Sequence, residues 1–145
     1  MQVPAAPSSS SEPQTEARQP SQSEEALDGY EYFQRGYTAF QSHNYAEAKS
    51  LYLRGAEKGD SNSMYWLGQL YGRGLGVAPD YNAARVWYQK SADHGSAIAV
   101  YSIGLLYLEG GPGMARDCNL AREWLTKAVA RGVSAAQSLL SRTCY

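Results

Sequence analysis

The sequence predicts an all-α fold, an α-solenoid of about seven helices built from repeated helix pairs. The first basis is an internal repeat, because the segments 45–59, 81–95 and 118–132 align at spacings of 36 and 37 residues. The second is the segment 62–74, which aligns with 98–110 at a spacing of 36. The third is that apolar residues within each segment recur three and four positions apart, the periodicity of an amphipathic helix.

We expect helices, in chain order, at 28–41, 45–57, 61–72, 81–93, 97–109, 118–130 and 134–143. Asn44, with Glu47 three residues later, forms an asparagine version of the capping box. Asp80 and Asp117 are placed to accept hydrogen bonds from the free N–H groups of the helices they precede. The residues expected to close helices in the left-handed conformation are Gly59, Gly95 and Gly132.

Residues 72–77, "GRGLGV", are rich in glycine and therefore raise the question of a phosphate-binding loop. A loop of that kind follows a strand and, in its Walker form, ends in Gly-Lys-Ser/Thr. Here the glycines follow a predicted helix, no lysine is present, and a similar loop recurs one repeat later as "EGGPGMARD". We therefore interpret both loops as sharp turns between antiparallel helices.

Composition divides the chain into two parts. Residues 1–25 are rich in Ser, Pro, Gln and Glu with a net charge of −3, and they are predicted to be a disordered tether. Residues 26–145, with a net charge of +2, are predicted to form the solenoid, with repeats at about 28–60, 61–96 and 97–133 and a capping helix at 134–145. The charge pattern does not indicate nucleic-acid binding, and no apolar run is long enough to span a membrane.

The first residues lack the charged and apolar regions of a signal peptide, so we expect a protein that is not exported or one whose signal has been removed. Deleting residues 1–25 should leave the melting temperature unchanged, because Val3 is their only strongly apolar side chain. Thermal unfolding of the two chains tests this expectation. A fall of several degrees, or slow amide exchange in this segment, would show that it docks on the solenoid.

The sequence offers little chemistry for catalysis or metal binding. His43 and His94 stand apart from any group of Cys, His and carboxylate residues with metal-ligand spacing. Neither Cys118 nor Cys144 has a histidine nearby in sequence, and no Gly-x-Ser-x-Gly elbow is present. We therefore expect no enzyme activity, no metal and no cofactor.

The pattern of one repeat runs from Ala99 through Ile103-Gly104, Tyr107 and Gly110 to Asp117, Ala121, Trp124 and Gly132. It resembles the Sel-one-like repeat, a relative of the tetratricopeptide repeat, and the resemblance covers about residues 28–145. The first unit departs from it, because a short Ser-His-Asn turn replaces the glycine loop. The resemblance implies a right-handed superhelix of antiparallel helix pairs, with Trp87 and Trp124 packed between layers. It also implies a binding module for a protein or peptide.

In the tetratricopeptide relatives, the first helix of each pair lines a concave groove. Carried over to this chain, that geometry predicts a groove formed by Phe33, Tyr37, Phe40, Asn62, Tyr65, Gln69, Arg73, Ile98, Tyr101, Leu105, Leu108, Ser138 and Arg142. These side chains include many rings and few charges, as in the centre of a protein-binding surface. The alternative, which stays open at this point, is that the aromatic residues only pack between adjacent helices.

We also expect a disulfide between Cys118 and Cys144, the only cysteines of the chain. Cys118 opens one helix and Cys144 lies at the close of the next, and consecutive antiparallel helices bring such positions to the same end of the stack. The bond would place the protein in an oxidising compartment, periplasmic or otherwise extracytoplasmic. The alternative is two free thiols in a cytoplasmic protein.

Together these features predict a non-enzymatic adaptor or scaffold that binds a protein or peptide in a concave aromatic groove, in a bacterial envelope or signalling assembly. The alternative function is an inhibitor or immunity-type protein that blocks a secreted enzyme or toxin. We expect no nucleic-acid partner and no insertion into a membrane, and we favour a monomer. The identity of the partner is not encoded in any motif of the sequence.

Overall fold

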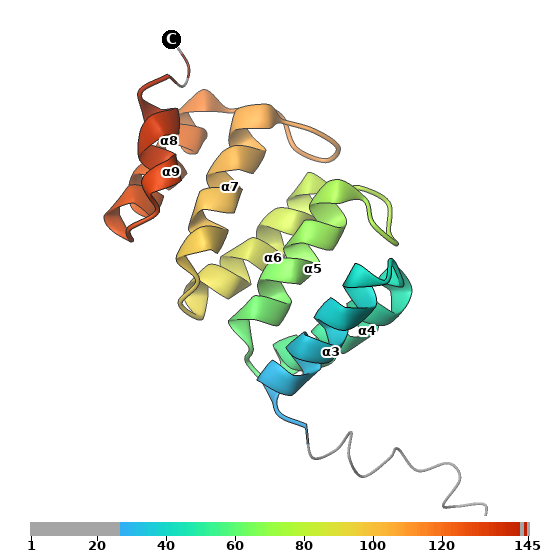
Figure 1. The fold of residues 1–145 in the computed structure, drawn as a ribbon. Helices are drawn as coiled ribbons and strands as arrows, with labels where there is room; N and C mark the ends of the chain where they lie inside the picture. The colour runs from blue at the N-terminus through green and yellow to red at the C-terminus, as the bar shows by residue number, and fades with distance from the viewer. Residues whose placement is uncertain (1–26, 143, 145) are drawn as a thin grey trace, which may run out of the picture.

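The structure is a computed structural model that describes residues 27–142 and 144, so the tether predicted for residues 1–25 lies outside it. The described residues form seven helices (Figure 1), which are α3 (Gly29–Gln41), α4 (Tyr45–Glu57), α5 (Ser61–Arg73), α6 (Tyr81–Asp93), α7 (Ala97–Glu109), α8 (Cys118–Ala130) and α9 (Ser134–Leu140). Six of them agree with the predicted bounds to within one residue at each end. The last helix is three residues shorter than predicted.

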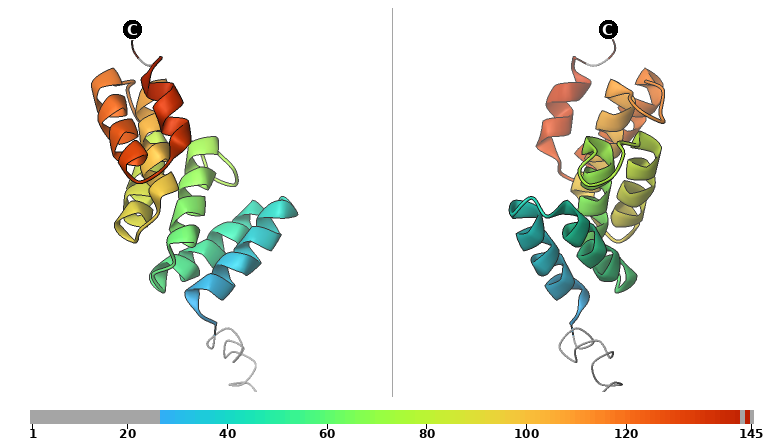
Figure 2. Two further views of the ribbon diagram at one scale, coloured as in Figure 1. Left: turned by 60° about the vertical axis from the view of Figure 1, so that its left-hand side comes forward. Right: turned by 90° about the vertical axis from the view of Figure 1, so that its right-hand side faces the viewer.

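Consecutive helices pack as antiparallel pairs, α3 with α4, α5 with α6 and α7 with α8, and α9 packs on α8 (Figure 1). Each second helix also packs on the first helix of the next pair, and α3 contacts α5. The pairs lie side by side, and the axes turn from one pair to the next (Figure 2). The predicted all-α solenoid of helix pairs is therefore confirmed.

Six of the seven described helices begin at a side chain that accepts a hydrogen bond from a backbone N–H group, and α9 is the exception. Asp60, Asp80 and Asp117 each accept a bond from the residue three positions on, as does Ser96. The full capping box is at Asp28, where the Glu31 carboxylate also accepts the Asp28 N–H. These bonds satisfy N–H groups that the first helical turn leaves free. They explain why the helix starts were predictable from the sequence.

The predicted capping box at Asn44 forms only in part. The Asn44 side chain accepts a hydrogen bond from the Glu47 N–H at 3.4 Å. The Glu47 carboxylate then accepts from the Asn44 side-chain amide at 2.8 Å rather than from its backbone. The preceding turn places His43 at a φ of 62°, the left-handed region in which histidine is tolerated better than most residues. The short turn thus replaces the glycine loop of the later repeats.

The two glycine loops pack against the preceding repeat. Gly76, at a φ of 74°, lies so close to α4 that an added Cβ would sit 2.7 Å from the Tyr45 Cβ. In the next repeat an added Cβ at Gly111 would sit 2.7 Å from the Tyr81 ring, and the Tyr81 N–H donates to the Pro112 carbonyl at 2.6 Å. Tyr45 and Tyr81 occupy the same position of the repeat. Each packs against the glycine loop of the following helix pair.

Small residues bring the two helices of each pair together. A Cβ added at Gly36 would lie 2.6 Å from the Tyr52 ring, and one added at Gly104 would lie 2.9 Å from the Leu125 side chain. Across the same interfaces, the second helices contribute alanines with no exposed surface, Ala48, Ala84 and Ala121. The close approach that the repeat pattern implied is therefore present in all three pairs. Two clusters of buried side chains result, one on each side of α5.

The two repeat tryptophans pack between layers but are not buried. Trp87 packs against the cluster of the first repeat and α5, and Trp124 packs against the cluster of the following repeats. Both remain half-buried, with the Lys90 ammonium 4.6 Å from the Trp87 ring and the Lys127 ammonium 4.2 Å from the Trp124 ring. Each lysine covers the exposed face of its ring through a cation–π contact.

Two equivalent tyrosines give a matched test of buried hydroxyl groups. Tyr52 is fully buried, and its Oη has no hydrogen-bond partner among the described residues. Tyr88, at the same repeat position, is hydrogen-bonded to the Ser102 side chain. Tyr52→Phe is therefore expected to leave the free energy of unfolding unchanged or raise it by about 1 kcal/mol, and Tyr88→Phe to lower it by about 1 kcal/mol. Urea unfolding of both variants measures the difference, and an equal loss for both would contradict it.

Candidate protein-binding groove

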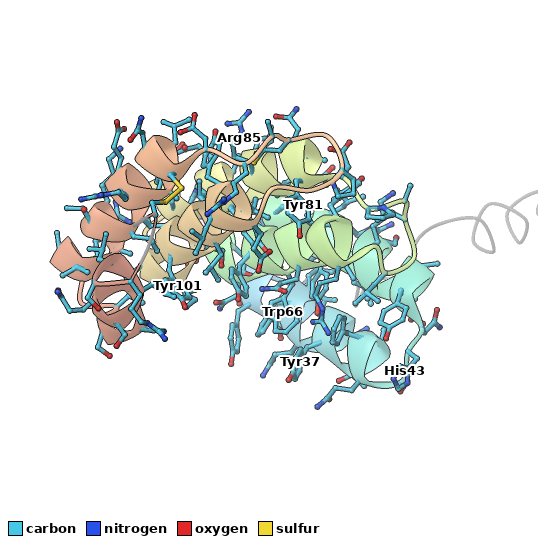
Figure 3. The ribbon with its side chains drawn as sticks, turned by 90° about the horizontal axis from the view of Figure 1, so that it is seen from above. Tyr37, His43, Trp66, Tyr81, Arg85 and Tyr101 are labelled. Atoms are coloured by element: carbon cyan, nitrogen blue, oxygen red, sulfur yellow. A yellow bond between two sulfur atoms is a disulfide. The ribbon has the colours of Figure 1, made fainter. Side chains whose placement is uncertain are left out.

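The first helices of the three pairs place aromatic side chains on one side of the stack. Tyr37 of α3, Trp66 of α5 and Tyr101 of α7 lie along this side, opposite Arg85 of α6 (Figure 3). Phe33, Tyr65 and Tyr101 share one position of the repeat, and all three are half-buried against the core clusters. These rings therefore pack against the core while part of each ring remains exposed.

The aromatic wall, defined here as Phe33, Tyr37, Phe40, Tyr65 and Trp66, is continuous from α3 to α5. The Tyr37 ring stacks on that of Phe40 with centroids 6.2 Å apart and an interplanar angle of 5°. Its other contacts are with Phe33 at 6.0 Å and Trp66 at 5.3 Å. Trp66 meets Tyr65 edge to face at 5.7 Å. Rings that hold each other in this way lose little conformational freedom when a partner binds.

Trp66 was not among the residues predicted for the groove. Its repeat position carries Gln34 in the first unit and Ser102 in the third, so the repeat pattern gave it no apolar role. The structure places it against Tyr37 and Phe40, at the junction between the first two pairs. The sequence does contain a signal for this role of Trp66. It is a large aromatic residue at a position where the other repeats carry small or polar side chains.

A cleft opens beside the aromatic wall, between α5, α6 and α7. It measures about 160 Å³, and its lining includes Gln69, Gly72, Arg73, Tyr81, Tyr88, Leu105 and Glu109. Gln69, Arg73 and Leu105 are predicted groove residues that the structure brings together here. The prediction did not include the residues of α6 that line the cleft, nor Gly72 of α5 and Glu109 of α7. It was based on one face of each first helix and took no account of the second helix beside it.

The polar groups around the cleft are the hydroxyls of Tyr81, Tyr88 and Ser102, the Gln69 amide, and the charges of Arg73 and Glu109. Burial raises the pKa of Tyr88, and burial together with the nearby Glu109 carboxylate raises the pKa of Tyr81. Both rings therefore stay protonated well above neutral pH. The Tyr81 hydroxyl donates to Glu109 at 3.2 Å, and the Gln69 amide donates to the Tyr65 hydroxyl at 2.6 Å. Arg73, with its guanidinium 5.9 Å from the Phe40 ring, joins the cleft to the aromatic wall.

The remaining predicted groove residues are dispersed. Asn62 is exposed, as is Ile98 with 43% of its surface accessible. Leu108 is half-buried, and its carbonyl accepts a bond from Arg116. Ser138 and Arg142 are exposed at the C-terminal end and contact each other through an Arg142 side-chain bond to the Ser138 carbonyl. None of these five lines the cleft.

Cys118 and Cys144 are joined by a disulfide, with their Cα atoms 5.7 Å apart. Cys118 occupies the same repeat position as Tyr45 and Tyr81, the two tyrosines that pack against the glycine loops. The chain turns after α9 to bring Cys144, at a φ of 65°, onto this position. That turn explains why α9 ends at Leu140 rather than at the predicted residue 143.

Within residues 27–142 and at 144, no group of three or more His, Cys, Asp and Glu side chains is arranged to hold a metal ion. In the same part of the chain, no helix combines the length and apolarity that crossing a bilayer requires. His94 caps α6, with its Nδ1 3.0 Å from the Lys90 carbonyl. The groove offers aromatic surfaces, hydrogen-bonding groups and the single charges of Arg73 and Glu109.

Comparison with known proteins supplies a family and a set of structures. The family described as the Sel1 repeat matches three consecutive segments, residues 26–60, 61–96 and 97–133. The crystal structure of a Sel1 repeat protein from Oxalobacter formigenes is similar, with a TM-score of 0.65 and 30% identity over 79% of this chain and 88% of the other. A protective antigen of uropathogenic Escherichia coli with an SLR fold has a TM-score of 0.70 and 31% identity, covering 80% of this chain and 26% of the antigen.

Among curated proteins, the ERAD-associated E3 ubiquitin-protein ligase component HRD3 of Candida glabrata is 36% identical over 55 residues. The matched region is 38% of this chain and only 7% of that relative. The chain therefore shares a stretch of repeat with HRD3 and spans a small part of its length.

Proposed function

Because the chain belongs to the Sel1 repeat family, which commonly mediates protein–protein interaction, we propose that it is a non-enzymatic adaptor that binds a protein segment along the aromatic wall, the cleft and Tyr101. The observation that carries this proposal is the row of rings on α3, α5 and α7 on one side of the stack (Figure 3). Aromatic residues are enriched among the side chains that dominate binding energy at protein interfaces.

The physical support is rigidity combined with low charge. A solenoid holds its binding surface in a fixed shape, so that little ordering entropy is lost when a partner binds. The wall itself contains no charged side chain, and Arg73 and Glu109 lie at its end, beside the cleft. A surface with an apolar centre and charges at its edge is typical of a protein-binding site.

The disulfide supports an extracytoplasmic setting for this function, because such bonds persist mainly in oxidising compartments. A periplasmic or other envelope location is accordingly part of the proposal. Intact mass after alkylation of the protein purified from its native cell, with and without reductant, tests it. Two alkylated thiols without reductant would favour the cytoplasm instead.

The adaptor function is tested by substitution of Tyr101, which lies on the proposed binding side but outside the cleft. Peptides selected from a displayed random library by the full chain serve as the probe. Tyr101→Ala is expected to weaken their binding by about 2 kcal/mol, the usual threshold for a hot spot. Tyr37→Ala, in the wall, should have a similar effect. Isothermal titration calorimetry gives both values.

The control is Val86→Ala, at an exposed side chain of α6 that lines neither the wall nor the cleft. It should leave peptide binding unchanged. Circular dichroism confirms that each variant is folded before binding is compared. Unchanged binding by folded Tyr37→Ala and Tyr101→Ala would refute the proposed binding surface.

A further inference from the structure

Gly72 is a glycine that the fold does not require. It lies in the last turn of α5 without a positive φ. A Cβ added there would meet only the Ala84 Cβ at 3.6 Å and the Tyr88 hydroxyl at 4.0 Å, both ordinary van der Waals contacts. A helical glycine costs up to about 1 kcal/mol relative to alanine. The glycine therefore lowers stability and is explained neither by packing nor by backbone conformation.

The other repeats fill the position that Gly72 leaves empty. Its equivalents are Phe40 in the first repeat and Leu108 in the third. The Phe40 ring occupies the space next to the first residue of the second helix, edge to face with Tyr45 at 5.4 Å. Tyr81 is the equivalent of Tyr45, and it lines the cleft beside Gly72. The cleft is therefore the place where a ring sits in the first repeat and is missing in the second.

The size and walls of the cleft suit one aromatic ring. Its volume of about 160 Å³ is close to that of the engineered apolar cavity of about 150 Å³ that binds benzene, and below the roughly 300–1,000 Å³ of a drug-sized site. The rings of Tyr81 and Tyr88 and the side chain of Leu105 supply apolar and aromatic contacts. Aromatic pairs of this kind favour edge-to-face or offset arrangements.

The charged side chains beside the cleft indicate which group should accompany the aromatic ring that the cleft accommodates. Within the described residues, Arg73 has no carboxylate partner; its guanidinium lies over the Phe40 ring and near the Tyr88 hydroxyl. The other charge, on Glu109, already accepts a bond from the Tyr81 hydroxyl. A guanidinium with free N–H groups pairs best with a carboxylate, which it can bind through two parallel hydrogen bonds.

We propose that the cleft opened by Gly72 receives one aromatic side chain of the partner, and that a carboxylate next to this residue pairs with Arg73. The carboxylate is the side chain of an adjacent Asp or Glu, because the partner segment continues past the cleft along the aromatic wall. The ring takes the place that Phe40 has in the first repeat, against Tyr81 and Tyr88. This inference rests on the adaptor function proposed above and specifies the partner's chemistry at one point of that surface.

The test uses random peptide libraries displayed in two formats, one with a free C-terminus and one anchored through it. The full chain should enrich peptides with Phe, Tyr or Trp beside an acidic residue in both formats. Enrichment of a terminal aromatic residue in the first format alone would place the carboxylate at the C-terminus and overturn its assignment to a side chain. Enrichment with no aromatic preference in either format overturns the inference.

Three variants and one control variant are then compared with the wild type for binding of the selected peptides. Gly72→Phe supplies the missing ring from the chain itself and should weaken binding roughly tenfold or more. Gly72→Ala adds one methyl group and should give a smaller loss of binding affinity. This variant keeps the test valid if the larger substitution perturbs folding. Arg73→Gln should abolish the preference for an acidic peptide over its amide counterpart. Val86→Phe, which adds the same ring to an exposed position of α6 outside the cleft, is the matched control and should change nothing.

The results separate this inference from the adaptor proposal. Peptides that depend on Tyr37 and Tyr101 but bind equally to wild type and folded Gly72→Phe and Gly72→Ala would overturn the inference and leave the adaptor function standing. A failure to enrich any peptide relative to the folded Tyr37→Ala variant would overturn both. Loss of affinity in the Gly72 variants together with loss of acid preference in Arg73→Gln supports the inference.

Discussion

Gly68→Ala is expected to lower the free energy of unfolding by about 2 kcal/mol. The added methyl group overpacks a closed interface, and this destabilisation exceeds the stabilisation from the higher helix propensity of alanine. Gly68 is buried in α5, and an added Cβ would lie 2.5 Å from the Tyr88 Cδ1 and 2.9 Å from its Cζ. Tyr88 is itself buried, so neither side can move without disturbing the pair.

Gly72→Ala is the matched control for this prediction, four residues further along the same helix. The added methyl group has room there, so the variant should be unchanged or more stable by up to about 1 kcal/mol. Urea unfolding followed by circular dichroism measures both variants. Combining Gly68→Ala with Tyr88→Ala should remove most of the Gly68→Ala penalty. A similar stability change for the two glycines, or no coupling to Tyr88, would refute the close-approach explanation.

Reduction of the Cys118–Cys144 disulfide is expected to destabilise the C-terminal end by roughly 3.5 kcal/mol in the chain-entropy model for a separation of 26 residues. The effect should concentrate in α9, which has seven residues and no side-chain cap at its start. A helix of this length is marginal without tertiary support. The bond supplies that support at the position where the earlier repeats use the contact between a tyrosine and a glycine loop.

Hydrogen exchange with mass spectrometry locates the effect. Amides of residues 134–140 should exchange faster after reduction, while those of α5 and α6 keep their protection. The double variant Cys118→Ser/Cys144→Ser, with and without reductant, controls for effects of the reductant on the rest of the fold. Equal protection of α9 in the oxidised and reduced protein would contradict the prediction.

The sequence by itself determined the repeat, the bounds of six of the seven described helices and the turns. These features depend on local chemistry: side chains that accept N–H bonds at helix starts, and glycines at positive φ where helices close, as at Gly95 with a φ of 103°. The pairing of helices followed from the resemblance to a repeat family, in which small residues such as Gly68 and Gly104 allow antiparallel helices to approach closely. Periodicity also placed Phe33, Tyr65 and Tyr101 at one repeat position, because that position is a property of each helix alone.

Only the tertiary structure decided how the repeats meet. Trp66 joined the aromatic wall because the first pair packs against α5 and brings Tyr37 and Phe40 onto it. The cleft at Gly72 depends on what α6 and α7 place around a missing side chain, and a helical pattern describes one helix rather than the space between three. Ser138 and Arg142 lie outside that cleft because α9 packs on α8, whereas the cleft is lined by α5, α6 and α7. Such features arise from contacts between residues distant in sequence, which no local periodicity encodes.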